Sequence, residues 1–90
     1  MTPQEIKERI YLIIAEELRE ELGKDIGPIT EKTDLSKWLK CGSPIHILIL
    51  NRIGTAIKNS KFIADVVNIS KVEELLKTVL KSYNEKDAWH

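Results

Sequence analysis

Three side chains close together in the sequence could take part in chemistry: the Cys41 thiol, the Ser43 hydroxyl and the His46 imidazole. A thiol or hydroxyl beside a base can act as a nucleophile, but such a site also needs a third group that orients the base. No third group stands out, and a histidine in the first turn of a helix usually lies on the surface. A structural zinc site needs four ligands, and the other histidine is the distant His90. We therefore expect no catalytic site and no metal site, and we do not expect an enzyme.

Ser43 followed by Pro44 predicts the start of a helix, because serine caps free backbone N–H groups and proline fits the first helical position. We expect this helix to run to about Asn59. A spacing of three or four residues gives its inward face, which comprises Ile47, Leu50, Ile53 or Gly54, and Ile57.

The same helix has more apolar residues than one face can bury. The positions expected nearer the solvent are Ile45, Leu48 or Ile49, Arg52 and Ala56. Exposed apolar surface commonly marks a protein contact, so this face is a candidate for partner docking through Ile45, Ile49 and Arg52.

The chain before Ser43 predicts one helix and one long loop. Thr2 and Glu5 form a capping box around Pro3, apolar residues then recur at helical spacing, and Gly23 supplies a C-terminal stop. Residues 24–42 show no sustained periodicity, so we expect an ordered loop with one short turn near 35–39. A loop of this length tends to be functional or to be held by its own apolar residues.

After Ser43's helix the sequence predicts two further helices. The apolar segment 62–69 is short, and we interpret it as a brief helix because no partner strand is evident. Ser70 and Glu73 form a second capping box before a final amphipathic helix that reaches Tyr83. The fold class is therefore all-α: three main helices and one short helix in a single domain over residues 1–83, followed by a polar tail over 84–90.

The composition indicates the cellular location of the protein and the classes of partner that it is not expected to bind. The 14 basic and 14 acidic side chains cancel, so nothing in the charge favours nucleic acid or an anionic membrane. No apolar run approaches the ~20 residues of a membrane span, and the first residues lack the apolar run of a secretory signal. One cysteine cannot form an internal disulfide. We expect a cytoplasmic monomer.

The order of helix, long loop, serine-capped helix, short helix and final helix resembles the acyl carrier protein family, as a four-helix bundle. Leu35 and Leu39 stand eight and four residues before Ser43, as the buried apolar residues of the family's loop do. Ile47, Leu50 and Ile53 match the inward face of the family's second helix, and Ile69 and Val72 resemble the pair that joins its last two helices. The resemblance covers residues 6–83.

The resemblance implies a function for Ser43. It implies that this serine carries a covalent 4'-phosphopantetheine, that an acyl group is held on the arm as a thioester, and that Ile47, Leu50 and Ile53 line a pocket for the acyl chain. It also implies the partners: a phosphopantetheinyl transferase and the acyl-transferring or condensing enzymes of fatty-acid, polyketide or related specialised biosynthesis.

A second hypothesis remains open beside the carrier. Gly42 and Pro44 flank Ser43 where the family usually has aspartate and leucine, and residues 43–59 contain no acid, although the family's second helix is typically acidic. Gly42 and Pro44 favour a carrier-like interaction module that has lost the prosthetic group and binds a partner through the apolar face around Ile45 and Ile49. An enzyme that uses Cys41 or His46 is the third and weakest alternative.

Overall fold

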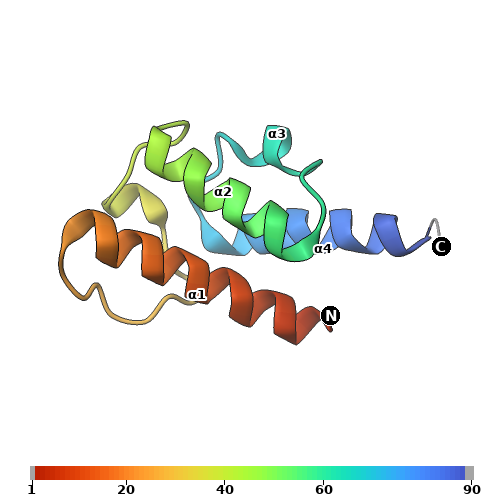
Figure 1. Ribbon diagram of the computed structural model, residues 1–90, viewed down its shortest axis with the longest axis horizontal. Coiled ribbons are helices and arrows are strands. Elements are labelled where there is room, and N and C mark those ends of the chain that lie inside the picture. The colour runs from red at the N-terminus through yellow and green to blue at the C-terminus, as the bar shows by residue number, and fades with distance from the viewer. Residues whose placement is uncertain (1, 89–90) are drawn as a thin grey trace.

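The protein is built from helices over the part that the computed structural model describes, namely the backbone of residues 2–88 and the side chains of residues 2–83. The elements in chain order are α1 (Pro3–Leu22), the 3-10 turn η1 (Leu35–Lys37), α2 (Pro44–Ile57), α3 (Ile63–Val66) and α4 (Val72–Ala88) (Figure 1). Within residues 2–88 the only β-type pairing is an isolated bridge between Asp34 and Lys71. The predicted all-α fold, with its short third helix, is confirmed.

α1 begins and ends as the sequence predicts. Thr2 Oγ1 accepts a hydrogen bond from the Glu5 N–H, and a Glu5 carboxylate oxygen accepts one from the Thr2 N–H, so the capping box is complete. Gly23 ends the helix with φ 67°, a left-handed conformation that glycine adopts without strain. The buried face of α1 comprises Ile6, Ile10, Ile13, Ile14, Ala15, Glu17 and Leu18.

The long loop between α1 and α2 is held by backbone hydrogen bonds to the start of α4. The Leu35 N–H donates to the Ser70 carbonyl at 2.8 Å, and the Val72 N–H donates to the Thr33 carbonyl at 3.0 Å. Buried Ile29, Leu35 and Leu39 fix the same loop from inside. These bonds and buried side chains give the loop a defined position beside the helices.

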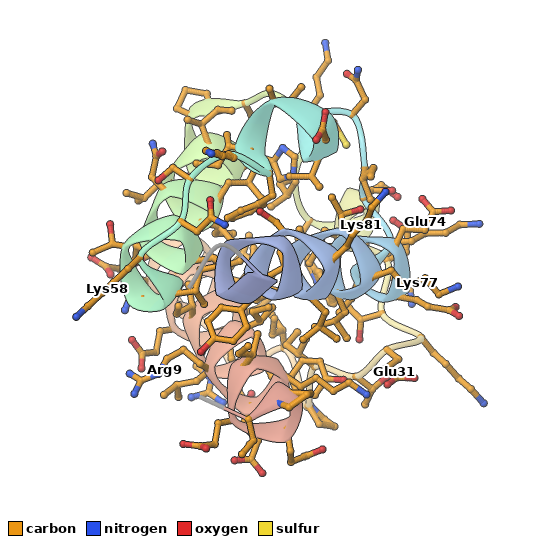
Figure 2. The ribbon with its side chains drawn as sticks, turned by 90° about the vertical axis from the view of Figure 1, so that its right-hand side faces the viewer. Arg9, Glu31, Lys58, Glu74, Lys77 and Lys81 are labelled. Carbon is orange, nitrogen blue, oxygen red and sulfur yellow. The ribbon has the colours of Figure 1, made fainter. Side chains whose placement is uncertain are left out.

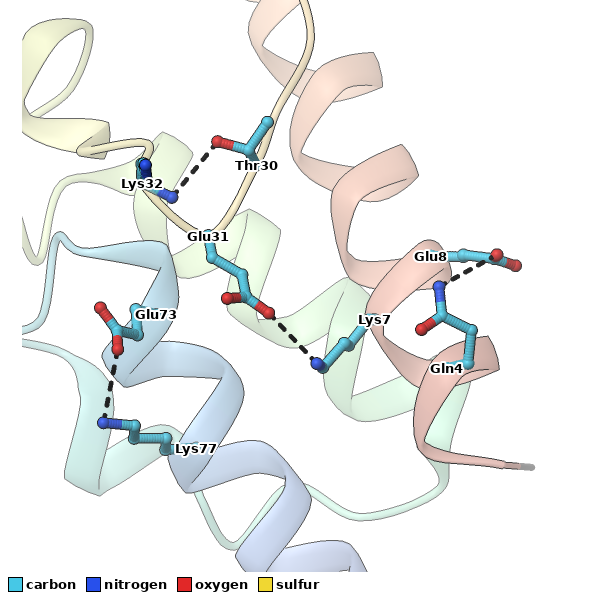
Figure 3. Close-up of polar contacts among 8 residues, drawn as sticks. All are labelled: Gln4, Lys7, Glu8, Thr30, Glu31, Lys32, Glu73 and Lys77. Atoms are coloured by element: carbon cyan, nitrogen blue, oxygen red, sulfur yellow. Dashed lines mark hydrogen bonds and ion pairs between the residues drawn. The ribbon is translucent and has the colours of Figure 1, made fainter.

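The loop also contacts α1, because Lys7 Nζ lies 3.1 Å from a Glu31 carboxylate oxygen (Figure 3). α4 begins at Val72, one residue later than a cap at Ser70 requires. The predicted cap is misplaced because the bridge between Asp34 and Lys71 keeps the backbone extended through Lys71.

α1 and α2 lie side by side and run in opposite directions, with α4 packed along the core behind them (Figure 1). The core draws on every helix and on the loop: Phe62, Val66, Leu75 and Val79 join the buried residues of α1 and α2. α4 continues to Ala88, so helical backbone extends into the segment that we predicted as a tail. Trp89 and His90 of that segment lie outside the described residues.

Candidate functional site at the start of α2

Ser43 occupies the N-cap of α2, as predicted. Its backbone is extended, with φ −67° and ψ 161°, and its Oγ accepts a hydrogen bond from the His46 N–H at 3.4 Å. The Ser43 N–H donates to the Lys40 carbonyl at 3.0 Å, which closes a turn over residues 40–43. Ser43 is half-buried, whereas Gly42 and Pro44 on either side are exposed. Its hydroxyl therefore lies near the surface and is held by one long hydrogen bond.

His46 is fully buried, and the prediction that it lies on the surface is wrong. Its Nδ1 accepts a hydrogen bond from the Gly42 N–H at 3.0 Å. The Gly42 backbone has φ 80°, a left-handed conformation that lets the turn direct this N–H back toward the helix. Because Nδ1 is the acceptor, we assign the proton of the neutral ring to Nε2.

The other ring nitrogen of His46, Nε2, is enclosed by the protein. Nε2 is buried and has no hydrogen-bond partner among the described residues. Burial lowers the pKa of His46, and the backbone of Ile69 opposes this shift without reversing it. The imidazole is therefore held in its neutral form, with one nitrogen engaged in the turn before Ser43.

The apolar residues that the sequence assigned to an acyl-chain pocket lie along the inner side of α2. Leu50 and Ile53 are fully buried, while Ile47 is half-buried and packs at the edge of the core. Gly54 and Ile57 are also buried, so the predicted inward face is confirmed apart from the partial exposure of Ile47.

The predicted outer face of α2 needs correction at Ile49. Ile49 is fully buried, because α2 packs against α1 on one side and α3 on another and so buries more than one stripe. Leu48, with 46% exposure, takes the outward position, and Ile45 is half-buried beside it. Ile49 therefore cannot present its side chain to a partner in this structure.

Arg52 is engaged within the molecule. Its Nη1 donates to a Glu17 carboxylate oxygen at 2.6 Å and its Nη2 donates to a Glu16 carboxylate oxygen at 3.1 Å, both on α1. The hydrogen bonds to Glu17 and then to Glu16 raise the pKa of Arg52. Sequence reasoning missed this pairing because helical spacing reports on one helix and says nothing about which residues face it from another.

Other chemistry-bearing residues do not form a second centre in the described part of the chain. Cys41 is a half-buried free thiol, and no group of three His, Cys, Asp or Glu side chains among the described residues could hold a metal. Within the same residues, no helix is both long and apolar enough to cross a membrane.

Three surface hollows lie away from Ser43. One of about 310 Å³ lies between α3 and α4, where Lys77 and Lys81 extend from α4 (Figure 2). A second of about 340 Å³ lies between α1 and α2 beside Arg9 and Arg52, and a third of about 300 Å³ lies along α1. None of these three hollows is lined by Ile47, Leu50 or Ile53.

A scan against protein-family models and searches of curated proteins and of solved structures found no match to this chain.

Proposed function

We propose that this chain is a carrier protein in which Ser43 bears a 4'-phosphopantetheine arm. The observation that supports the proposal most directly is the placement of Ser43 at the surface cap of α2, after a long loop and ahead of the buried Leu50 and Ile53. The arm, when attached, supplies a thiol that holds an acyl group as a thioester. The chain itself supplies attachment, position and a surface for partner enzymes.

The residues around Ser43 fit a phosphodiester at its Oγ. The N–H groups of Ile45 and His46 belong to the first turn of α2, and the positive end of the helix dipole favours a negative charge there. Residues 43–59 contain no carboxylate that would repel a phosphate. Gly42 and Pro44 are exposed, which leaves the hydroxyl approachable by a modifying enzyme.

We place the acyl chain beside Ile47, Leu50 and Ile53, on the inner side of α2. Because Leu50 and Ile53 are already fully buried, sheltering a chain there requires neighbouring side chains to separate. The partners of such a carrier are a phosphopantetheinyl transferase and acyl-transferring or condensing enzymes, in a cytoplasmic setting.

Intact mass tests the proposal. Incubation with coenzyme A and a broad-specificity phosphopantetheinyl transferase should add one phosphopantetheinyl group to the wild type and none to Ser43→Ala. Ser36→Ala is the matched control, since Ser36 is an exposed serine in η1 and its loss should leave the mass gain unchanged. A wild type that stays unmodified with several transferases, including that of its source organism, contradicts the proposal.

A second candidate is an interaction module without a prosthetic group, favoured by Gly42 and Pro44 and by the exposure of Leu48. Since Arg52 is paired with α1, the partner's contribution would be an apolar surface over Ile45 and Leu48. For this candidate the mass should stay unchanged, and Leu48→Glu should weaken binding of the natural partner more than Arg52→Ala. Equal affinity for wild type and Leu48→Glu would exclude this surface.

A further inference from the structure

We propose that His46 is a proton-sensitive latch: in its neutral form it holds the Gly42–Ser43–Pro44 turn closed against α2, and in its protonated form it releases that turn. The proposal is independent of what Ser43 carries, because it concerns only the hydrogen bond and the burial of one side chain. It assigns to His46 a positioning role that the carrier proposal does not use.

His46 holds the turn at two points. Its Nδ1 accepts the Gly42 N–H at 3.0 Å, and its own N–H donates to Ser43 Oγ at 3.4 Å. The two bonds form a variant of a capping box, in which an imidazole replaces the usual carboxylate at the third helical residue and reaches the residue before the cap. One residue therefore fixes the backbone on both sides of the Gly42–Ser43 peptide.

Protonation removes the first of these bonds. In an imidazolium both ring nitrogens carry a proton, so Nδ1 can no longer accept from Gly42 and two N–H donors face each other. The charge would also lie in a fully buried position where Nε2 has no hydrogen-bond partner among the described residues. Closing the turn and charging the ring are therefore mutually exclusive.

No neighbouring charged side chain stabilises a protonated His46 in the closed turn. The titratable side chains of the elements around α2 include Glu17 on α1, Lys40 and Cys41 before α2, Asp65 on α3 and Lys71 before α4. Glu17 is paired with Arg52, and Lys40, Asp65 and Lys71 are exposed. The pKa of His46 is lowered by burial, with the Ile69 backbone as the opposing influence, and no charged side chain contributes to the shift.

Burial couples proton uptake to opening. Because the ring has no exposed surface in the closed turn, the open turn is the form that takes up the proton. If only the open form binds a proton, the ratio of open to closed molecules rises by about tenfold per pH unit below a pH of about 6.5.

Nuclear magnetic resonance of the ¹⁵N-labelled chain tests the latch directly. The variant His90→Ala leaves His46 as the only histidine, so its ring nitrogens can be followed without overlap. Near neutral pH we expect a nitrogen–nitrogen coupling across the hydrogen bond between the Gly42 amide and His46 Nδ1. On acidification this coupling should disappear, and the Gly42 and Ser43 amide shifts should change, at the same pH at which the ring titrates.

Two variants separate the latch from general loss of structure. His46→Asn keeps an acceptor near the position of Nδ1 but cannot take up a proton, so its turn should show no change over the same pH range. Ser43→Ala removes the cap oxygen but not the Gly42 bond, so it should keep the pH response. A wild-type coupling that is absent at neutral pH, or turn amides that ignore the titration of His46, would overturn the proposal even if His46→Asn does not fold.

Discussion

The starts of α1 and α2 use the same motif with different chemistry. At α1, Thr2 and Glu5 exchange two hydrogen bonds in the open, and the acceptor that reaches back is an exposed carboxylate. At α2, Ser43 and His46 occupy the equivalent positions, but the acceptor that reaches back is a buried imidazole and its donor is Gly42. The N-terminus of α1 depends only on neighbouring residues in the sequence, whereas the N-terminus of α2 depends on a side chain that is buried in the core.

Both acceptors have a lowered pKa, for opposite reasons. For Glu5 the hydrogen bonds from Thr2 stabilise the charged carboxylate. For His46 burial penalises the charged imidazolium. A protein can therefore make a helix start sensitive to protons either by binding a charge or by excluding one, and the second way ties the helix start to the packing around it.

The largest effect that would sharpen this comparison is expected from His46→Ala. Removing a fully buried side chain leaves a cavity, so we expect a loss of roughly 3 kcal/mol in the free energy of unfolding. Glu5→Ala should lose much less, because Glu5 is exposed and leaves no cavity. Urea denaturation of both variants measures the difference, and equal losses would mean that burial does not distinguish the two starts.

The two N-cap hydroxyls should contribute similar amounts to the free energy of unfolding. Ser43→Ala and Thr2→Ala each remove one hydroxyl acceptor, and each should cost about 1 kcal/mol of unfolding free energy. The bond at Ser43 is longer, 3.4 Å against 3.2 Å at Thr2, so the Ser43 variant should not be the more costly one. A clearly greater loss at Ser43 in urea denaturation would show that its hydroxyl has a further partner.

As the pH falls, the loss of stability that comes from His46 at the N-terminus of α2 should appear before the loss that comes from Glu5. The unfolded chain binds a proton at His46 near the ordinary pKa of 6.5, and the folded chain binds it only at lower pH. Stability from His46 is therefore complete above that value, falls as pH drops below it, and levels off below the folded pKa. We expect this loss to be smaller than that of His46→Ala, because the ring still fills its space. Urea denaturation from pH 8 to pH 4 should show this decline in the free energy of unfolding of the wild type and a smaller one in His46→Asn. An equal decline in both would contradict the assignment of the pH dependence to His46.

The smallest effect is expected from Glu5→Gln. The lowered pKa of Glu5 means that its contribution is present above the ordinary value of 4.5 and is lost as pH falls through the folded pKa. The amide keeps an acceptor oxygen for the Thr2 N–H but has no charge, so the variant should be slightly less stable than wild type at neutral pH and equal to it in strong acid. Thermal unfolding at both pH values measures this, and a difference that persists in acid would point to a cause other than the charge.

The predicted elements follow from local rules that hold whatever the tertiary contacts are. The Thr2–Glu5 capping box, Gly23 and the Ser43–Pro44 pair fix where α1 ends and where α1 and α2 begin, because caps and proline act within one turn of chain. The start of α4 was misplaced for the converse reason. Lys71, the residue before α4, forms a bridge to Asp34, a contact between segments far apart in the sequence.

The candidate site was predictable only in part. The sequence indicated Ser43 as a cap and Leu50 and Ile53 as inward-facing, since spacing along one helix defines one face. It placed Ile49 outside, because a single inward stripe describes a helix with one packed side. It also placed His46 on the surface, because base rates for histidine ignore a neighbouring turn that can supply a donor.

The sequence alone therefore determined the all-α class, the caps of α1 and α2 and the residue that begins α2, since each depends on residues within a few positions of one another. Only the tertiary structure decided that α2 is covered on more than one side, that Arg52 is paired with Glu16 and Glu17, and that the His46 ring is buried with Gly42 as its donor. These facts depend on which elements meet in space. The periodic spacing of apolar residues indicates which face of a helix is buried, but it does not indicate which other element covers that face.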